Sequence, residues 1–253
     1  MTPEPRFLTA EWRNLAMLNY EIDHAILAGR VPAGCELDSW AGRSFVSIVG
    51  FQFLDTRVLG VPIPLHRHFE EVNLRFYVRR RVEGAWRRGV VFVKELVPRR
   101  AIAAVARHVY GENYVALPMR HAVGASTEGG TTTVTYQWRR VGAWEGVWVS
   151  FSGPPALCSD EAEETFITEH YWGYSRQRDR STVEYQVEHP RWRVWRAGTA
   201  ALECEVSSLY GPEFVEALSG SPSTAFIADG SPVVVRKGRR LNWCGHRRPS
   251  RMD

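Results

Sequence analysis

The sequence predicts an α+β protein in which one mostly antiparallel β-sheet or barrel dominates and a few short helices lie at its edge. Aromatic residues make up 12% and hydrophobic residues 44% of the 253 residues, which favours a sheet with a sizeable core. Apolar and polar residues alternate in about ten segments, whereas about four short segments show helical signals. Most of the strands follow one another along the chain, so antiparallel pairing is expected.

The N-terminal half is expected to contain four strands and one helix. The helix should begin at Asp23, a natural N-cap, and end before Pro32 and Gly34. A hairpin is expected where Glu83 and Gly84 separate two β-prone runs. The four strands are expected over 12–22, 43–54, 71–81 and 89–97.

The C-terminal half combines further strands with three helices. Ser159 is a suitable N-cap and acidic residues follow it, so a helix is expected to begin there. Pro212 lies near the start of another helix. A turn at Asp229 and Gly230 is expected to separate the last two strands. The helices are expected over 99–111, 159–171 and 207–218, and the strands over 131–140, 143–153, 181–189, 191–198, 201–206 and on either side of the last turn.

The chain contains no internal repeat and no low-complexity linker. We therefore expect one domain over residues 1–241, followed by a basic C-terminal tail over residues 242–253. The densest basic run extends from Arg236 to Arg251, and it is expected to be a frayed terminus, with RNA binding as the alternative.

Composition points to a cytoplasmic protein without a membrane partner. The N-terminal residues lack the apolar segment of a signal peptide, and no apolar run approaches the length of a membrane helix. The four cysteines are scattered and form no CxxC pair, which argues against a zinc site or a disulfide framework and fits a reducing compartment. Self-association into a homo-oligomer is open.

The basic residues are almost all arginines, because only two of the 32 are lysines. A general preference for arginine explains this bias, and the alternative is recognition of phosphate groups by guanidinium side chains. The arginine pairs are dispersed along the chain and fall at expected strand ends. A nucleic-acid-binding protein would gather them on one element with interleaved aromatics, so a nucleic-acid partner is not expected.

One face of the expected strand over 71–81 is polar. Side chains alternate between the two faces of a strand, so Glu71, Asn73 and Arg75 lie on one side and apolar residues on the other. If the polar face looks into a barrel it is a binding surface, and if it looks at solvent the strand is an ordinary half-exposed one. His66 and His68 precede this strand and could bind a metal with a neighbouring glutamate, but no third or fourth ligand has a matching spacing. We expect them to belong to a loop, and we expect no metal.

The motifs of nucleotide-dependent and serine-hydrolase chemistry are absent from the sequence. It contains no P-loop, no GxGxxG and no GxSxG. We therefore expect no cofactor.

Several strings of the sequence resemble one bacterial protein family. They are "FLTAEWRNLAMLNYEID", "RVPAGCELD", "FEEVNLRFYVRR", "YGENYVALPMRH", "EHYWGYSRQRD", "VEHPRW" and "LYGPEF". Together they resemble the YqjF-like proteins of unknown function, and the resemblance extends over residues 7–241. That family is more distantly similar to acetoacetate decarboxylase. The resemblance implies a cone-shaped antiparallel β-barrel with a few short peripheral helices and a polar pocket at its centre.

The resemblance also implies a set of pocket residues. Acetoacetate decarboxylase uses a lysine that forms a Schiff base with a keto acid, and a second lysine beside it lowers the pKa of the first. Pro118, Met119 and Arg120 match the segment that carries this pair, so methionine stands in the place of the nucleophile. Glu71 matches the acid of the decarboxylase and Arg13 matches an arginine near its first strand. Tyr114 and Asn73 complete the expected ligand-binding set.

Lys94 is a candidate for a displaced Schiff-base amine. It lies in "VVFVKELV", a strand that is apolar on both faces, and burial there would lower its pKa. The simpler interpretation is a lysine that pairs with a carboxylate such as Glu71.

Three functional hypotheses follow. The leading one is a protein that binds a small, anionic, oxygenated metabolite, with Arg13 and Arg120 on its carboxylate and Glu71 as hydrogen-bond acceptor or general acid–base. The alternative is a cofactor-free enzyme, such as a hydratase, dehydratase, isomerase or lyase, in which Glu71, Lys94 and Arg120 act on a small oxo acid. The third is a structural or interaction protein whose barrel is filled by side chains.

Overall fold

The computed structural model describes residues 4–62, 66–99, 113–124 and 130–241. The helix expected over 99–111 lies almost wholly outside these residues, and the tail over 242–253 lies outside them entirely. Strands account for most of the described chain. They are β1 (Arg6–Ile22), β2 (Glu36–Leu37), β3 (Ser44–Val58), β4 (Val61–Pro62), β5 (Phe69–Val82), β6 (Ala85–Val97), β7 (Tyr114–Ala116), β8 (Met119–Val123), β9 (Thr131–Arg140), β10 (Ala143–Ser152), β11 (Trp172–Arg176), β12 (Thr182–Glu188), β13 (Val194–Glu203), β14 (Thr224–Arg236) and β15 (Arg239–Leu241).

The described helices are short, as the sequence predicts. They are α1 (His24–Ala28), α3 (Glu163–Thr168), α4 (Val206–Leu209), the 3₁₀ helix η1 (Pro212–Phe214) and α5 (Val215–Leu218). Asp23 caps α1 by accepting a hydrogen bond from the Ala25 amide. Helix α3 begins four residues after the expected N-cap Ser159, and its N-cap residue Ala162 offers no side-chain bond.

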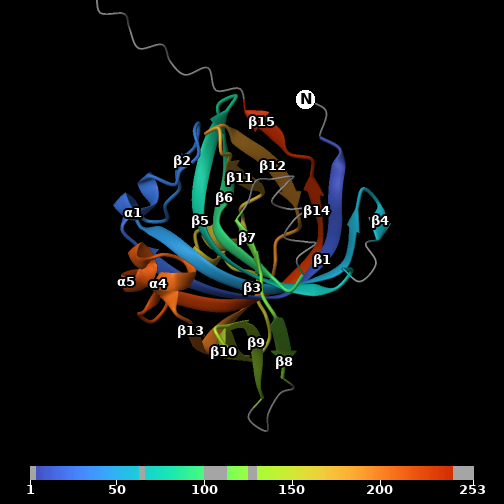
Figure 1. Cartoon of the computed structure of the whole chain (residues 1–253), viewed down its shortest axis with the longest axis vertical. Coiled ribbons are helices and arrows are strands. Elements are labelled where there is room, and N and C mark those ends of the chain that lie inside the picture. The colour runs from blue at the N-terminus through green and yellow to red at the C-terminus, as the bar shows by residue number, and fades with distance from the viewer. Residues whose placement is uncertain (1–3, 63–65, 100–112, 125–129, 242–253) are drawn as a thin grey trace, which may run out of the picture.

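Seven strands close into a ring, which Figure 1 views nearly end-on. Its order is β12-β11-β6-β5-β3-β1-β14, and the pairing of β12 with β14 completes the circle. Most pairs are antiparallel, while β6 pairs in parallel with β11 and with the short β7. The mostly antiparallel fold that the sequence predicts is therefore confirmed, with a mixed sheet as a refinement.

A second group of strands extends from the ring. β13 pairs with β14, and β10, β9 and β8 follow in order away from it. They form the lower part of the molecule in Figure 1. We call β13, β10, β9 and β8 the extension.

The β5–β6 hairpin is confirmed in register and turn. Val82 pairs with Ala85, and both connecting residues have positive φ, at 50° for Glu83 and 84° for Gly84. Positive φ at two central residues is typical of the turns whose twist matches that of a hairpin.

Two expected strand breaks do not exist. β14 runs unbroken through Asp229 and Gly230, because β1 pairs with it on both sides of that dipeptide, from Asn19↔Thr224 to Arg6↔Arg236. The runs expected over 191–198 and 201–206 are likewise one strand, β13. A turn signal in the sequence is overridden where a long neighbouring strand supplies continuous hydrogen bonds.

β-Bulges in three ring strands change which face of the strand looks inward. Register shifts occur at Asn14 in β1, at Asp55 in β3 and between Phe92 and Lys94 in β6. In β1, Trp12 lines the inside of the ring before the bulge, and Leu15 does so after it. An extra residue on one strand reverses the alternation beyond it, because side chains repeat with a period of two.

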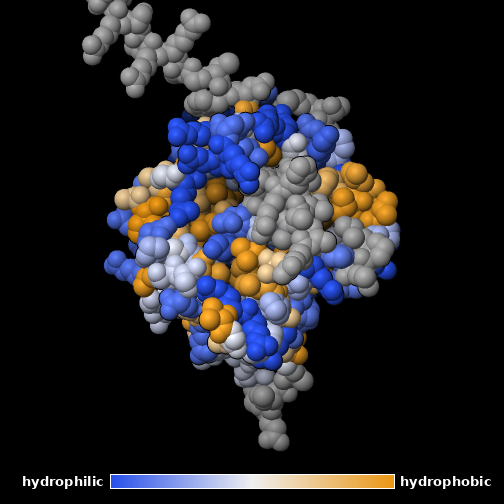
Figure 2. Space-filling model, in the orientation of Figure 1, coloured by the Kyte–Doolittle hydropathy of each residue, from blue (hydrophilic) through white to orange (hydrophobic). Residues whose placement is uncertain are grey.

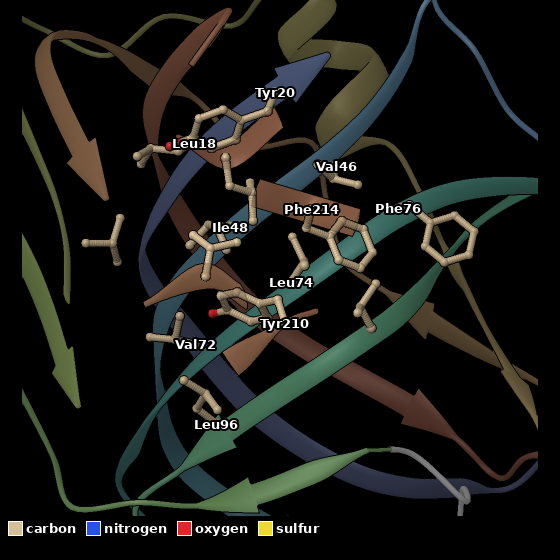
Figure 3. Close-up of a cluster of buried hydrophobic side chains, with 14 of the residues drawn as sticks. Leu18, Tyr20, Val46, Ile48, Val72, Leu74, Phe76, Leu96, Tyr210 and Phe214 are labelled. Carbon is tan, nitrogen blue, oxygen red and sulfur yellow. The ribbon is translucent and has the colours of Figure 1, made fainter. Parts of the chain in front are cut away.

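The outer face of the ring packs against the extension and the C-terminal helices. Leu18, Ile48 and Leu74 project from β1, β3 and β5 towards Tyr210 and Phe214 of the helical segment (Figure 3). Figure 3 shows part of this outer cluster, which continues to the aromatic residues of β9. Burial of these side chains holds the ring against the extension.

The face shown in Figure 2 carries both hydrophilic and hydrophobic areas. One hydrophobic area lies at the right, over β4, where Leu59 and Val61 are 70% and 64% exposed. Within the described ranges, no helix combines the length and apolar character that crossing a membrane requires.

Candidate functional site

The ring encloses a cavity of about 200 Å³. All seven ring strands contribute to its wall, which is mainly aromatic and aliphatic. Polar groups are concentrated on β5, on β6 and in the segment that follows α3. The lining residues are Phe7, Leu8, Trp12, Leu15, Val49, Phe51, Phe53, Thr56, Val58, His66, Phe69, Glu71, Asn73, Arg75, Val90, Phe92, Glu95, Tyr114, Thr168, His170, Trp172, Tyr185, Val187, His189, Trp192 and Val235.

Glu71, Asn73 and Arg75 form a polar row along the inner face of β5. Glu71 is 3% exposed and Asn73 is 2% exposed. Asn73 Nδ2 donates to Glu71 Oε1 at 3.0 Å, and the Tyr114 hydroxyl donates to Oε2 at 3.3 Å. The strand alternation that the sequence shows therefore brings these side chains together inside the ring.

Burial raises the pKa of Glu71 to about 7. The hydrogen bonds from Asn73 and Tyr114 and the charge of Arg75 oppose this shift without cancelling it. Near neutral pH the side chain is thus divided between carboxylic acid and carboxylate. A group in that state can donate a proton or accept one.

Arg75 brings a positive charge to the same wall. Its Nη2 donates to the Ile167 carbonyl oxygen at 3.2 Å, and its guanidinium carbon lies 5.6 Å from the Tyr77 ring centroid. Among the described residues no carboxylate lies within ion-pair distance of Arg75, and its Nε has no hydrogen-bond partner. A half-buried guanidinium in this state is suited to bind an anion.

His170 stands on the wall near Arg75 and is supported from behind. Its Nε2 lies 3.4 Å from Asp38 Oδ2, and Arg88 Nε donates to the same oxygen at 2.7 Å. Burial, with the charges of Arg88 and Arg75, lowers the pKa of His170 to about 4, although Asp38 opposes this. The imidazole is therefore neutral at neutral pH.

Several buried polar atoms around the cavity have no hydrogen-bond partner among the described residues. Buried polar groups are normally paired, so a concentration of unpaired ones at one cavity marks a site where a ligand completes the bonding. These atoms are Trp12 Nε1, Thr56 Oγ1, Asn73 Oδ1, Arg75 Nε, and both ring nitrogens of His170, Nδ1 and Nε2.

Of the predicted site residues, Glu71, Asn73 and Tyr114 meet at the cavity, whereas Arg13, Met119, Lys94 and Arg120 lie outside it. Trp12 occupies the inward position at that point of β1. Glu11 and Arg13 therefore lie on the other face of the strand, where they form an ion pair. The location of Arg13 corrects the expectation that it would face the ligand.

Met119 and Arg120 are displaced because β8 belongs to the extension and not to the ring. Arg120 Nε donates to Gln137 Oε1 at 2.8 Å, and the guanidinium carbon lies 4.0 Å from the centroid of the exposed Trp144 ring. Met119 packs against the outer cluster. The sequence match that placed these residues beside Glu71 is therefore not reproduced in space.

Lys94 lies on the opposite face of β6 from the cavity. The bulge in β6 places Phe92 and Glu95 on the wall and leaves Lys94 outside. Its Nζ donates to the Leu209 carbonyl oxygen, and burial followed by the charge of Arg140 lowers its pKa. Lys94 and Lys237 are the two lysines of the chain, and neither lines the cavity.

Sequence reasoning missed several wall residues. Arg75 could have been predicted as a site residue, because the alternation along β5 places it on the same face as Glu71 and Asn73. His66 also lines the cavity, from outside the strands as expected, although sequence reasoning did not include it among the site residues. His170 gave no signal, since nothing near it in sequence indicates Asp38. The described residues contain no cluster of three or more histidine, cysteine or acidic side chains suited to a metal.

Comparisons with known structures identify the fold. The chain is similar to an acetoacetate decarboxylase-like enzyme from Sphingomonas wittichii, with a TM-score of 0.65, 12% identity and 94% of each chain covered. It is similar to the acetoacetate decarboxylase of Legionella pneumophila, with a TM-score of 0.62, 13% identity and coverage of 95% of this chain and 90% of the other. The enduracididine biosynthesis enzyme MppR, solved with pyruvate, gives a TM-score of 0.63 at 13% identity and coverage of 95% and 91%.

Sequence comparison identifies the family. The chain is 25% identical over 202 residues to the uncharacterized protein YqjF of Bacillus subtilis, which covers 78% of each protein. Residues 9–232 match the model of DUF2071, a family described as an uncharacterized conserved protein. Since this match takes in most of the sequence, the protein belongs to the DUF2071 family, whose relatives include the YqjF-like proteins.

Proposed function

We propose that the protein binds a small carboxylate-bearing metabolite in the cavity of the ring. Arg75 takes the carboxylate, and Glu71 forms a hydrogen bond to a second oxygen of the ligand. The observation that carries this proposal is that the Arg75 guanidinium has no carboxylate partner among the described residues. Arg75 lies in a largely apolar cavity together with Glu71, whose pKa is about 7.

Arg75 favours an anion at its own part of the wall, which elsewhere carries the carboxyl groups of Glu71 and Glu95. An apolar wall strengthens the attraction between Arg75 and a carboxylate, because the effective dielectric constant is lower than in water. Protonated Glu71 adds no repulsion and can donate its proton to the ligand. An incoming cation would meet the charge of Arg75 instead.

The size of the cavity favours a small ligand. Its volume of about 200 Å³ is below the roughly 300–1,000 Å³ typical of sites for drug-sized molecules. Fold analogy points to the same chemical class, since MppR has been solved with pyruvate. We therefore take small 2-oxo acids as the first probes.

Pyruvate and 2-oxobutyrate binding, measured by calorimetry and by ligand-observed NMR, tests the proposal. Arg75→Met should weaken binding at least about tenfold, because it removes a charge-assisted hydrogen bond. Arg120→Met is the matched control, as that arginine lies outside the ring against Trp144. Equal affinity in wild type and Arg75→Met, or equal losses in the two variants, would contradict the assignment.

Acid–base catalysis on an oxo acid is the second candidate function. It is favoured by the pKa of Glu71, because a general acid or base works best when its pKa is near the working pH. Schiff-base chemistry receives no such support, since neither lysine lines the cavity. Exchange of the C3 protons of pyruvate in D₂O should be faster with the protein present and slower with Glu71→Gln; no exchange above the buffer rate would remove this candidate.

The proposed setting is the cytoplasm. Cys35, Cys158 and Cys204 are free, as expected in a reducing compartment. Among the described residues, many arginines form ion pairs with carboxylates, and Arg80, Arg87 and Arg239 all pair with Glu184, which supports a small-molecule ligand over a nucleic acid. Single-domain organisation and self-association stay predictions.

A further inference from the structure

His170 is the most firmly positioned titratable group on the cavity wall. Its side chain is 1% exposed and lies between two aromatic rings, with centroids 4.7 Å from Tyr77 and 5.2 Å from Phe166. These contacts come from β5 and α3, so two separate elements fix the plane of the imidazole. Both ring nitrogens are buried, and neither has a hydrogen-bond partner among the described residues.

Asp38 is the carboxylate that faces His170, with its Oδ2 3.4 Å from Nε2, a contact whose geometry falls short of a hydrogen bond. This carboxylate is 4% exposed, and it receives hydrogen bonds from Arg88 Nε at 2.7 Å and from the Ser39 amide at 3.0 Å. Burial by itself raises the pKa of Asp38, but the interactions with His170 and Arg88 outweigh it and hold the pKa at about 2. An ionised carboxylate beside Nε2 favours the tautomer protonated at Nε2, which leaves a lone pair on Nδ1.

Nδ1 has no described partner for that lone pair. It is buried, and His170 is part of the cavity wall. Arg75 and His170 both lie against the Tyr77 ring, at 5.6 Å and 4.7 Å from its centroid. Glu71 lies on the same inner face of β5 as Arg75. A carboxylate held by Arg75 would therefore extend into the space that Glu71 and His170 also reach.

We infer that His170, oriented by Asp38, is the base that removes a proton from carbon 3 of a 2-oxo acid bound on Arg75. This inference rests on the proposed carboxylate site and names its reaction class, keto–enol tautomerisation. Nδ1 takes the proton from carbon 3, the electron pair of the C–H bond forms the carbon–carbon double bond, and the carbonyl electrons move to oxygen. Glu71 in its acid form gives its proton to that oxygen, so charge and atoms balance. Return of the protons completes the exchange.

The charged groups around His170 agree with this role. Asp38 faces it from the segment after β2, Arg88 from β6 and Arg75 from β5. Burial lowers the pKa of His170, and the two guanidinium charges add to this effect, so the imidazole is neutral and able to accept a proton at neutral pH. A bound carboxylate offsets the charge of Arg75 and makes His170 a stronger base once the ligand is in place.

Exchange of pyruvate C3 protons in D₂O, followed by ¹H NMR, tests the inference. His170→Asn should slow exchange at least about 100-fold and change pyruvate affinity by less than about threefold, since general-base catalysis contributes that much rate. Asp38→Asn should also slow exchange and alter its pH profile. His121→Asn is the matched control, because His121 lies 3.5 Å from the Glu70 carboxylate outside the ring and should retain the wild-type rate.

The outcomes separate this inference from the proposed function. Pyruvate that binds through Arg75 but does not exchange, or that exchanges equally with His170→Asn, overturns the inference and leaves the binding site intact. Failure of both oxo acids to bind overturns the proposed ligand class. The ¹⁵N NMR tautomer of His170 in the wild-type protein gives a readout that needs no ligand. A proton on Nε2 is expected, and a proton on Nδ1 would overturn the inference.

Discussion

Asn73 donates a hydrogen bond to Glu71 from two residues further along the same strand, at 3.0 Å. The period of a β-strand places both side chains on the inner face, so local backbone geometry positions the carboxyl group of Glu71 in the cavity. The bond supports one oxygen of Glu71, and Tyr114 contacts the other. Even with both donors, burial dominates and the pKa rises to about 7.

Glu71→Gln should stabilise the protein in a pH-dependent manner. Because the folded pKa is above the unfolded one, the folded state holds an extra proton between about pH 4.5 and about pH 7, and stability falls as the pH rises through this window. Above this pH window, ionised Glu71 lowers the free energy of unfolding of the wild-type protein by on the order of 3 kcal/mol. The variant should melt about 5 °C higher than wild type near pH 8 and at about the same temperature near pH 5. Thermal unfolding by circular dichroism measures this, and Glu21→Gln, at an exposed carboxylate, should show no such difference.

Carboxylate binding should weaken as the pH rises through about 7. Ionised Glu71 repels a second carboxylate and loses its donor proton, so affinity should fall by up to about tenfold per pH unit above the pKa. Calorimetry in two buffers of different ionisation enthalpy should also detect proton uptake on binding near pH 7. In Glu71→Gln the slope should disappear, and a slope of wild-type size in that variant would assign the titration to another group.

Two buried tyrosines of the outer cluster should respond oppositely to loss of their hydroxyl groups. The Tyr210 hydroxyl has no hydrogen-bond partner among the described residues, whereas the Tyr136 hydroxyl donates to the Asn14 carbonyl at 2.8 Å. Tyr210→Phe should raise the free energy of unfolding by about 1 kcal/mol, and Tyr136→Phe should lower it by about the same amount. Chemical denaturation compares them, and a large loss for Tyr210→Phe would indicate a partner for that hydroxyl.

Gly230 should tolerate no side chain, although it lies within a strand. Its φ is +80°, and a Cβ there would stand 2.0 Å from the Trp12 carbonyl oxygen of the paired strand. Gly142 has a similar φ of +85° but open space around it. Gly230→Ala should therefore lower the free energy of unfolding by about 3 kcal/mol or more, and Gly142→Ala should lower it by about 1 kcal/mol. Both substitutions place alanine in the left-handed backbone region, and at Gly230 the new Cβ also clashes with the paired strand. Equal costs in urea denaturation would contradict this reading of Gly230.

The sequence was most informative where hydrophobic alternation extends over a whole strand. It predicted the β5–β6 hairpin, and the polar face of β5 carries Glu71 and Asn73 into the cavity. It could not predict bulges, since a single extra residue leaves no mark in composition. The bulge in β6 is the reason that Lys94 lies outside the ring while Glu95 lies on its wall.

Contacts between distant segments were beyond the reach of sequence patterns. Asp38 and His170 are joined only by the fold, so neither predicted the other. For Arg120 the sequence resemblance predicted a place in the pocket that the fold does not provide, because its strand, β8, belongs to the extension. The strings identified the family and the fold, but the arrangement of side chains required the coordinates.

The β11–β12 hairpin meets its neighbours in the ring along two narrow seams. β11 pairs with β6 at Trp172↔Gly89 and Gly173↔Val90, and β12 pairs with β14 at Val187↔Val235 and Glu188↔Val234. Each seam is much shorter than the pairing between β1 and β3, so few backbone hydrogen bonds hold this hairpin in the ring. Its other ties include the ion pairs of Glu184 on β12 with Arg80 and Arg87. Backbone amides along the two seams should therefore exchange with deuterium sooner than those of β1.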